Sequence, residues 1–275
     1  MWYFPMGSEE EGSGSRAMRG PDISIPNVAR IYDFMLGGKD NFAADREAAH
    51  KVTQEIPHSA QACRQNRDFL GRVVRHLAAD RGIRQFLDIG SGLPTGRNVH
   101  EIAQATVPES RVVYVDYDSI VVTHARALLE CGAPTVMVVE GDLRNPRKII
   151  DGARGLIDFS APVAVLLFAI LHFLTDAEEP YEIVGSLAEA LAPGSAVAIS
   201  HITADGIEPA KSLAAQKVYQ GASAPAIPRS RQNIVRFFDG LELMAQGVTD
   251  INLWPGRSPG AEAPLTFYGG VGLKT

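Results

Sequence analysis

The sequence predicts an α/β fold in which a largely parallel β-sheet is flanked by helices. An apolar run at 85–89 ends in a tight glycine turn and is followed by a helix-compatible segment. Strand-like apolar runs then alternate with helix-like segments from 111 to 201, which is typical of βαβ units. The run at 163–168 is apolar throughout, as expected of a strand buried on both faces of a parallel sheet.

The composition indicates an ordinary globular chain and excludes several classes of partner. Its 275 residues are 45% hydrophobic and 21% charged, and the net charge of -6 offers no basic surface for nucleic acid. The longest apolar stretch, 161–174, contains Pro162 and His172 and is too short to cross a bilayer. Cys63 and Cys131 lie outside any C-x-x-C spacing, so we expect reduced thiols in a cytoplasmic protein with no membrane partner.

Three regions are expected along the chain. Residues 1–22 mix glycine, serine and a short acidic run, which indicates a flexible tail without a signal peptide. Residues 23–83 are predicted to form a helical cap. Residues 84–275 are predicted to form the α/β domain, with an insertion at about 203–231 where the periodicity is lost.

The cap is expected to hold three helices. Gly37 and Gly38 end the first helix, and either Asp40 or Asn41 is expected to cap the second. The three predicted helices span 25–36, 42–50 and 59–81.

The turn Gly90-Ser91-Gly92 follows the first predicted strand. Because glycine has no Cβ, this turn lets a ligand lie directly against the main chain. A helix expected to begin near Thr95 would offer unpaired N–H groups to polar ligand atoms. The structural alternative is an ordinary glycine turn.

Two nucleoside cofactors compete for this turn. A dinucleotide site requires G-x-G-x-x-G, but the third glycine position is occupied by Thr95. Asp88, at the end of the strand, would repel a pyrophosphate and suits an ammonium group. S-adenosylmethionine carries an ammonium group and no phosphate, so the pattern D-I-G-S-G favours it.

A second carboxylate follows at the end of the strand predicted at 111–116. Asp116 lies 28 residues after Asp88, about one helix and one strand further on. A carboxylate at the tip of the neighbouring strand can accept hydrogen bonds from both ribose hydroxyls. Asp116 is therefore the predicted ribose ligand, with Tyr117 beside it in the predicted site. Asp118 is the second choice, and a solvated strand-end aspartate is the structural alternative.

The segment PNVARIYDFMLGGKDNFAADREAA resembles the N-terminal signature of a bacterial family of S-adenosylmethionine-dependent methyltransferases. Further matches run from about Ile25 to the C-terminus and include FLDIGSGLPT, NVHEIAQ, VVYVDYD, GDLRNP, LLFAILHFL and GGVGLK. The resemblance implies a class I, Rossmann-like fold with a seven-stranded sheet, six strands parallel and the last antiparallel. It implies S-adenosylmethionine as the cofactor, with Asp88 reaching the methionine amine, but it supplies no acceptor.

Two further strand ends complete the predicted cofactor site. The resemblance assigns Asp142 and Leu143 to the adenine edge, whereas the structural alternative for Asp142 is a capping aspartate. Phe168 and Ala169 follow the fourth strand, which should adjoin the first. His172 then lies where it could deprotonate a methyl acceptor, although a lone histidine here can also be purely structural.

The cap has two interpretations. It is either three packing helices or a lid over the cofactor, and its polar break favours the lid. In the lid hypothesis Lys39 and Asn41 face the methionine end, and Tyr32 or Phe42 offers an aromatic face to the sulfonium. In the same hypothesis the elbow helps to shape the acceptor pocket, whereas if the cap is only scaffold, the insertion at 203–231 builds that pocket.

The leading functional hypothesis is a methyltransferase acting on a small molecule, with O- and N-methylation both open. The absence of a D/N-P-P-Y tetrad after the fourth strand argues against amino methylation of nucleobases or glutamine. The first alternative is a non-catalytic protein that binds S-adenosylmethionine or S-adenosylhomocysteine. The second is an NAD-dependent oxidoreductase, which the missing third glycine disfavours. The sequence shows no metal-ligand cluster.

Overall fold

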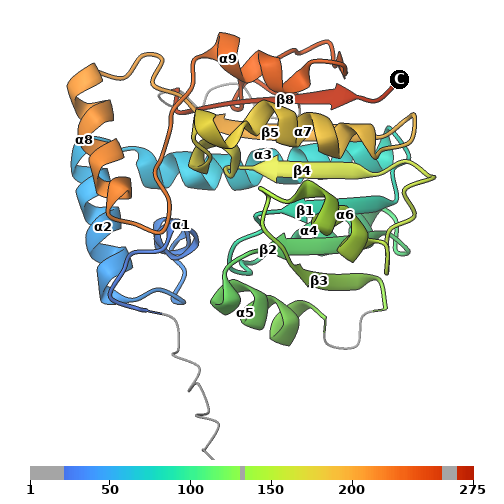
Figure 1. Cartoon of the computed structure of the whole chain (residues 1–275), viewed down its shortest axis with the longest axis horizontal. Coiled ribbons are helices and arrows are strands. Elements are labelled where there is room, and N and C mark those ends of the chain that lie inside the picture. The colour runs from blue at the N-terminus through green and yellow to red at the C-terminus, as the bar shows by residue number, and fades with distance from the viewer. Residues whose placement is uncertain (1–21, 131–133, 256–264) are drawn as a thin grey trace, which may run out of the picture.

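One β-sheet organises the chain (Figure 1). The computed structural model describes residues 22–130, 134–255 and 265–275. Within these ranges the strands follow the order β3-β2-β1-β4-β5-β8-β6, and β7 also pairs with β8. The strands are β1 (Gln85–Ile89), β2 (Arg111–Asp116), β3 (Val136–Glu140), β4 (Ala164–Phe168), β5 (Ala196–Ile202), β6 (Glu242–Leu243), β7 (Thr249–Asp250) and β8 (Phe267–Leu273).

The strand directions confirm the predicted sheet, with one strand more than expected. Strands β1 to β5 are mutually parallel, and β8 runs antiparallel to β5. The extra strand arises because β6 and β7 pair with different parts of β8, on the edge that β5 leaves open. A turn closed by the hydrogen bond from Gly247 N–H to Met244 O separates them. Two short strands therefore share one position of the sheet beside β8.

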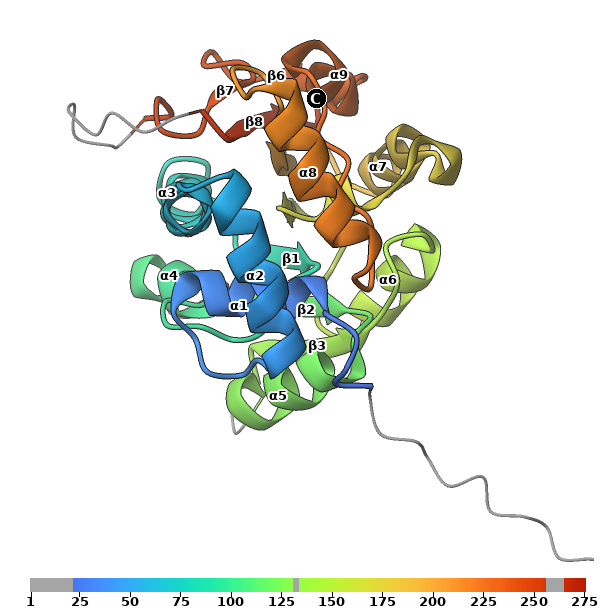
Figure 2. The same cartoon turned by 90° about the vertical axis from the view of Figure 1, so that its left-hand side faces the viewer.

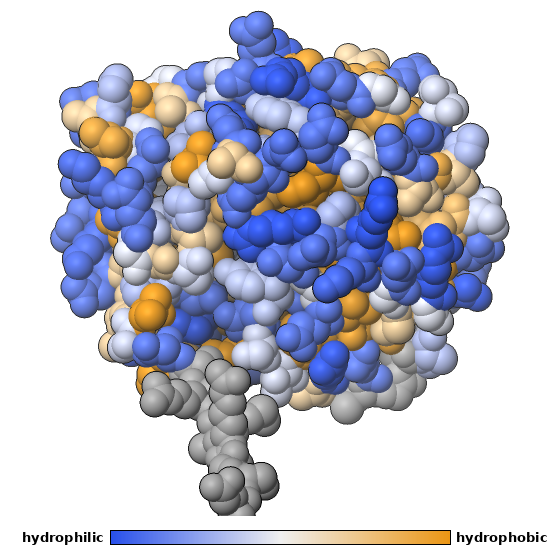
Figure 3. All heavy atoms as spheres, viewed as in Figure 1, coloured by the Kyte–Doolittle hydropathy of each residue, from blue (hydrophilic) through white to orange (hydrophobic). Residues whose placement is uncertain are grey.

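Helices cover both faces of the sheet, as two hydrophobic clusters show. One cluster joins α3, α4 and α5 to one face, and the other joins α6, α7 and α9 to the opposite face (Figure 1). These helices are α3 (Ser59–Ala79), α4 (Val99–Thr106), α5 (Ser119–Leu129), α6 (Pro146–Ala153), α7 (Pro180–Glu189) and α9 (Arg231–Val235). Hydrophilic side chains cover most of the face in Figure 3 and leave apolar ones visible between them, because the apolar sides of the helices are turned toward the sheet.

The cap is built from two distant parts of the sequence. Helices α1 (Val28–Leu36) and α2 (Ala43–Glu55) pack with α8 (Pro209–Gln220) and the first turns of α3. Their shared apolar cluster contains Ile31 and Val52, with Tyr219 packed against it. Figures 1 and 2 show α1, α2 and α8 together at the carboxyl ends of the parallel strands. Since α3 continues into the core beneath the sheet, the cap and the α/β domain share one long helix.

Several helix boundaries differ from the predictions for local physical reasons. Helix α4 begins at Val99, not near Thr95, so the expected helix N-terminus beside the glycine turn is wrong. Helix α5 begins at Ser119 because the Asp118 side chain accepts hydrogen bonds from two N–H groups of its first turn. Within 203–231, where no regular element was predicted, the chain forms α8. Helix α2 is stabilised at its start by Asp45, which accepts from Phe42 N–H at 2.8 Å, and not by Asp40 or Asn41.

Within the described ranges, none of the helices combines the length and the apolar composition needed to cross a bilayer. Cys63 is a buried free thiol, and Cys131 lies outside the described residues.

Candidate functional site

An open cavity lies at the carboxyl ends of β1, β2 and β4, beneath α1. The space above these strand ends is about 800 Å³, including the part that is open to solvent. It sits where the strand order changes direction between β1 and β4, the usual ligand position in such sheets. Of the residues predicted from the sequence, it is lined by Tyr32, Asp88, Gly90, Ser91, Gly92, Asp116, Tyr117, Phe168 and Ala169.

The glycine turn forms one wall of this first cavity. Gly90 and Gly92 have φ values of 70° and 67°, which favour glycine. A Cβ at Gly90 would lie 2.5 Å from the side chain of Ile170, whereas a Cβ at Gly92 would meet nothing within 4 Å. Gly92 N–H donates a 2.9 Å hydrogen bond to Asp116 Oδ2. The turn is therefore held by the protein itself and leaves open space on its cavity side.

Asp88 is the distinctive charged group of the first cavity. Its side chain is 4% exposed, and burial raises its pKa to about 7, an effect that Asp116 adds to and Arg67 opposes. Among the described residues no N–H or O–H group donates to its carboxylate. A buried carboxylate without a donor is costly, and a ligand ammonium group would supply both charge and hydrogen bonds. The ammonium group of S-adenosylmethionine therefore fits this position.

Two charged residues of the first cavity were missed at the sequence level. Arg67 lines the cavity from α3, and Asp33 lines it from α1. Arg67 could have been found, because it lies four residues after Cys63 and three before Leu70, on the buried face of the helix. With Asp88, Arg67 gives the cavity both a cationic and an anionic group, which matches the carboxylate and ammonium groups of a methionine moiety.

Asp116 and Asp118, the two candidate ribose ligands, differ in how much of each carboxylate is already used within the protein. Asp116 lines the cavity and accepts one N–H bond on each oxygen, from Gly92 and from Asp118. A carboxylate has about four acceptor positions, so Asp116 can still accept from ligand hydroxyls. Burial raises the pKa of Asp116 to about 6. Asp118 instead caps α5 and accepts a 2.6 Å hydrogen bond from Asn27 Nδ2. This geometry favours Asp116 as the ribose ligand.

The polar elbow of the cap is a structural cluster that touches the cavity through Asp33. Asn41 Nδ2 donates to Asp33 Oδ2 at 2.8 Å and to Gly38 O at 3.1 Å. A Cβ at Gly38 would lie only 1.9 Å from Asp33 Oδ1, which explains why a second glycine follows Gly37. Lys39 is exposed, and neither Lys39 nor Asn41 lines the cavity. Their predicted contact with the cofactor gains no support from this geometry.

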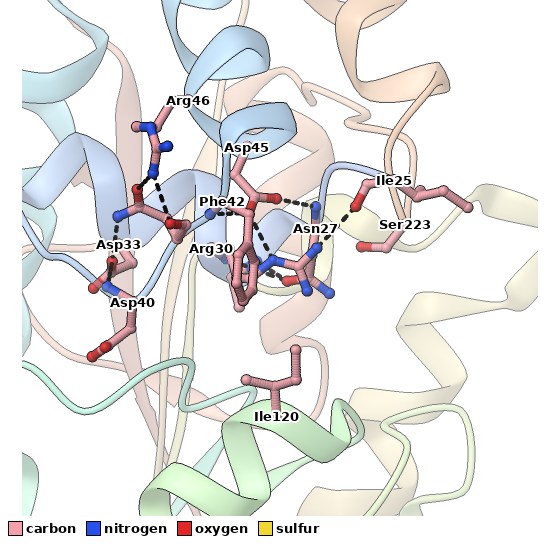
Figure 4. Close-up of polar contacts among 12 residues, drawn as sticks. Ile25, Asn27, Arg30, Asp33, Asp40, Phe42, Asp45, Arg46, Ile120 and Ser223 are labelled. Carbon is pink, nitrogen blue, oxygen red and sulfur yellow. Dashed lines mark hydrogen bonds and ion pairs between the residues drawn. The ribbon is translucent and has the colours of Figure 1, made fainter. Parts of the chain in front are cut away.

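The two aromatic residues predicted to face the sulfonium, Tyr32 and Phe42, lie in different places. Tyr32 lines the cavity with its ring, while its hydroxyl donates to Cys63 O and accepts from Asn66 Nδ2. Phe42 lies outside the lining, beneath the guanidinium of Arg30 at 5.4 Å. Arg30 is itself paired with buried Asp45 at 2.8 Å, as Figure 4 shows. Of the two aromatic residues predicted to face the sulfonium, Tyr32 lines the first cavity and Phe42 does not.

Asp142 and Leu143 do not line the first cavity. Asp142 caps its own turn through Arg144 N–H and pairs with the Arg144 guanidinium at 3.0 Å, and Leu143 is buried. Their role at the adenine edge stays a prediction from the resemblance.

A second cavity adjoins the first, beneath α8, with a volume of about 770 Å³ counted to its mouth. His172 lines this cavity and not the first. The two cavities meet at Ala169, whose φ of 53° is an uncommon value for a residue with a side chain. Such strained positions concentrate at functional sites.

His172 is buried in this wall and is held neutral. Burial lowers its pKa well below the usual value, with further lowering from His201 and Arg229. Its Nδ1 is sealed from solvent and has no hydrogen-bond partner among the described residues. A neutral imidazole with a depressed pKa is a weak base, so the geometry suits a hydrogen-bonding role better than the predicted proton abstraction. No group of three or more His, Cys, Asp or Glu among the described residues could hold a metal ion.

The strand order, the antiparallel last strand and the cavity above the glycine turn together define a Rossmann-like methyltransferase. The sequence model of the S-adenosyl methyltransferase family matches residues 15–275, and the chain belongs to this family, whose cofactor is S-adenosylmethionine. No curated protein matches the chain significantly.

Two crystal structures are similar over nearly the whole chain. A DUF574 family protein from Streptomyces avermitilis MA-4680 is 39% identical with a TM-score of 0.87, covering 92% of this chain and 99% of that one. A candidate methyltransferase from Thermobifida fusca YX is 39% identical with a TM-score of 0.86, covering 92% and 96%.

Proposed function

We propose that the protein methylates a small-molecule acceptor, with S-adenosylmethionine as the methyl donor. The observation that carries the proposal is Asp88, a buried carboxylate on the wall of the first cavity without a donor of its own. An ammonium group satisfies it, and a pyrophosphate would be repelled. This chemistry agrees with the cofactor of the family and disfavours NAD.

The residues of the first cavity divide the cofactor between them. Asp88 binds the ammonium group, and Arg67 binds the carboxylate of the same methionine moiety. Asp116 accepts hydrogen bonds from the ribose hydroxyls. Tyr32 presents its ring to the sulfonium, a cation that aromatic faces attract.

The acceptor is placed in the second cavity. The two cavities share Val28, Tyr32, Ala169 and Phe173, so a molecule in the second lies against the same wall as the cofactor in the first. The second cavity is lined mainly by apolar and aromatic side chains with a few polar groups, as small-molecule sites are. Its cover is α8, from the region in which an acceptor pocket was predicted.

Positioning is the main catalytic contribution of the chain. When bound, S-adenosylmethionine supplies an electrophilic methyl group, so reaction depends on in-line placement of the acceptor atom more than on proton transfer. Helices α1 and α8 cover the two cavities and keep water from the reacting atoms. His172, neutral and buried, offers the acceptor a hydrogen bond.

A ligand panel tests the proposal. S-adenosylhomocysteine and S-adenosylmethionine should raise the melting temperature of the full chain, and NAD and NADP should not, because a ligand stabilises only the state it binds. Stabilisation by NAD equal to that by S-adenosylhomocysteine would overturn the cofactor assignment.

Turnover is then followed as S-adenosylhomocysteine formed from S-adenosylmethionine and a panel of small acceptors. Acceptor-dependent product supports methyl transfer. Tight cofactor binding without turnover on any acceptor would favour a non-catalytic binding protein.

A further inference from the structure

The second cavity differs from the first in its charge. The first is lined by four aspartates and one arginine: Asp33, Asp88, Asp116, Asp118 and Arg67. Among the described residues that line the second, none is Asp, Glu, Lys or Arg. Two adjoining cavities in one protein therefore offer very different environments to a ligand.

The titratable groups of the second cavity carry no charge either. Burial raises the pKa of the Cys63 thiol to about 12 and raises the pKa values of Tyr32 and Tyr219 above their usual range. Burial lowers the pKa of His172 far below neutrality. All four groups are uncharged at neutral pH.

The buried cation that acts electrostatically on His172 is already paired. Arg229 lies behind His172 and is not among the lining residues. Its guanidinium donates to the backbone oxygens of Leu171 and Leu174 and pairs with Asp176 at 2.6 Å. No counter-charge is therefore free to neutralise an ionised ligand in this cavity.

Aromatic rings and one imidazole dominate the wall nearest the first cavity. The His172 ring lies 4.3 Å from Phe173 and 6.2 Å from Phe267, measured between centroids, and Phe173 lies 6.0 Å from Tyr219. All four rings line the cavity. His172 Nδ1 is sealed from solvent, whereas His172 Nε2 is not sealed and makes no hydrogen bond among the described residues, so Nε2 is the nitrogen that this wall can offer to a ligand.

We infer that the second cavity selects an uncharged, largely apolar aromatic acceptor that presents a hydroxyl group to His172. A charged ligand would lose its hydration there without a compensating partner, whereas an aromatic ring gains apolar contacts. That the bound molecule is a methyl acceptor rests on the proposed function, whereas the preference for an uncharged aromatic ligand does not. On methylation the hydroxyl oxygen gains the methyl group, the carbon–sulfur bond breaks with its electron pair left on sulfur, and the hydroxyl proton leaves to solvent.

Three naphthalene probes of the same ring and different charge test the inference. Binding of 2-naphthol, 2-naphthoate and 2-naphthylmethylammonium is measured by calorimetry at pH 7.5 on the full chain saturated with S-adenosylhomocysteine. We expect 2-naphthol to bind on the order of tenfold or more tightly than either ion. Equal or tighter binding of an ion, or no binding of 2-naphthol, would overturn the inference.

Variants on α8 locate the binding. Ala215 is 8% exposed and lines the second cavity but not the first. Ala215→Phe should therefore abolish 2-naphthol binding and leave S-adenosylhomocysteine binding unchanged. Leu213, on the same helix, is 51% exposed, and Leu213→Phe is the matched control with both affinities retained. Retained 2-naphthol binding in Ala215→Phe would place the probe elsewhere.

Two further variants, which change one polar group each, keep the test decisive if Ala215→Phe fails to fold. Gln216→Glu puts a carboxylate on the cavity wall and should shift preference from 2-naphthoate toward 2-naphthylmethylammonium at least severalfold. His172→Phe should weaken 2-naphthol severalfold and leave naphthalene unaffected. Unshifted preferences in both variants would overturn the inference. Failure of S-adenosylhomocysteine to bind would instead overturn the proposed function.

Discussion

Asn27 and Asp118 lie 91 residues apart in the chain, yet Asn27 Nδ2 donates a 2.6 Å hydrogen bond to Asp118 Oδ2. Asn27 also caps α1, since its Oδ1 accepts from Ala29 and Arg30 N–H groups. The bond therefore fastens the start of the cap to the loop after β2. Both residues line the first cavity, so this contact closes the cavity at one end.

Loss of this contact should loosen the cap over the cofactor. Asn27→Ser keeps a capping oxygen but cannot reach Asp118, and Asn27→Asp keeps the cap but opposes two carboxylates. We expect both variants to bind S-adenosylhomocysteine more weakly, by about 1 kcal/mol for Asn27→Ser and by more for Asn27→Asp. Calorimetry of the three proteins checks the order. Equal affinity of Asn27→Asp and wild type would show that the contact is irrelevant to binding.

Cofactor binding should depend on pH through Asp88. With a pKa of about 7 in the ligand-free protein, Asp88 loses its charge as the pH falls, and an ammonium ligand must then compete with a proton. Affinity for S-adenosylhomocysteine should fall about fourfold from pH 8 to pH 6.5 as the ionised fraction falls. Asp88→Asn should bind weakly and show little pH dependence over this range. A wild-type affinity that is flat with pH would contradict the assignment of Asp88 to the ammonium group.

Asp88 should also make the stability of the ligand-free protein depend on pH. The pKa of Asp88 is raised in the folded state, so its contribution to stability is present below about pH 4 and is lost as the pH rises through about 7. The Asp88→Asn protein without ligand should therefore gain stability relative to wild type as the pH rises from 5 to 8. Urea denaturation at both pH values measures this difference, and an unchanged difference would mean that Asp88 is not buried as a charge.

The two glycines after α1 provide a matched pair. Gly37→Ala forces a residue with a Cβ to a φ of 88° and should lower stability by about 1–2 kcal/mol without touching the cavity. Gly38→Ala drives its Cβ into Asp33, which lines the cavity, so it should lower both stability and S-adenosylhomocysteine affinity. Melting curves and calorimetry separate the two effects. If both variants keep wild-type affinity, Asp33 does not contribute to binding.

Asp116→Ala should weaken S-adenosylhomocysteine binding by on the order of 1 to 3 kcal/mol, because two ribose hydroxyls lose a charged acceptor. Asp118→Ser is the comparison, since it keeps a cap for α5 and should cost less affinity. The reverse order, with Asp118→Ser the weaker binder, would move the ribose contact to Asp118.

The sheet and the strand-end residues were predictable because they follow local patterns. Apolar runs gave the strands, and Asp88 and Asp116 lie near the carboxyl ends of two adjacent parallel strands. Arg67 and Asn27 were not assigned to the cavity because each reaches it through packing between distant segments. Helix α8 escaped prediction because its apolar residues face both the cap and the second cavity, so no clean period marks it. The structural role of Asn41 could not be predicted, because sequence cannot show that its amide is bonded to Asp33.

The wall shared by the two cavities has a thermodynamic consequence. Tyr32 and Val28, both on α1, face a ligand in either cavity, so occupation of one restrains the helix that the other must order. Linkage then requires reciprocity: the factor by which S-adenosylhomocysteine changes the dissociation constant of 2-naphthol equals the factor by which 2-naphthol changes that of S-adenosylhomocysteine. Helix α1 thus couples the two cavities, so that a ligand in either one changes the affinity of the other by the same factor.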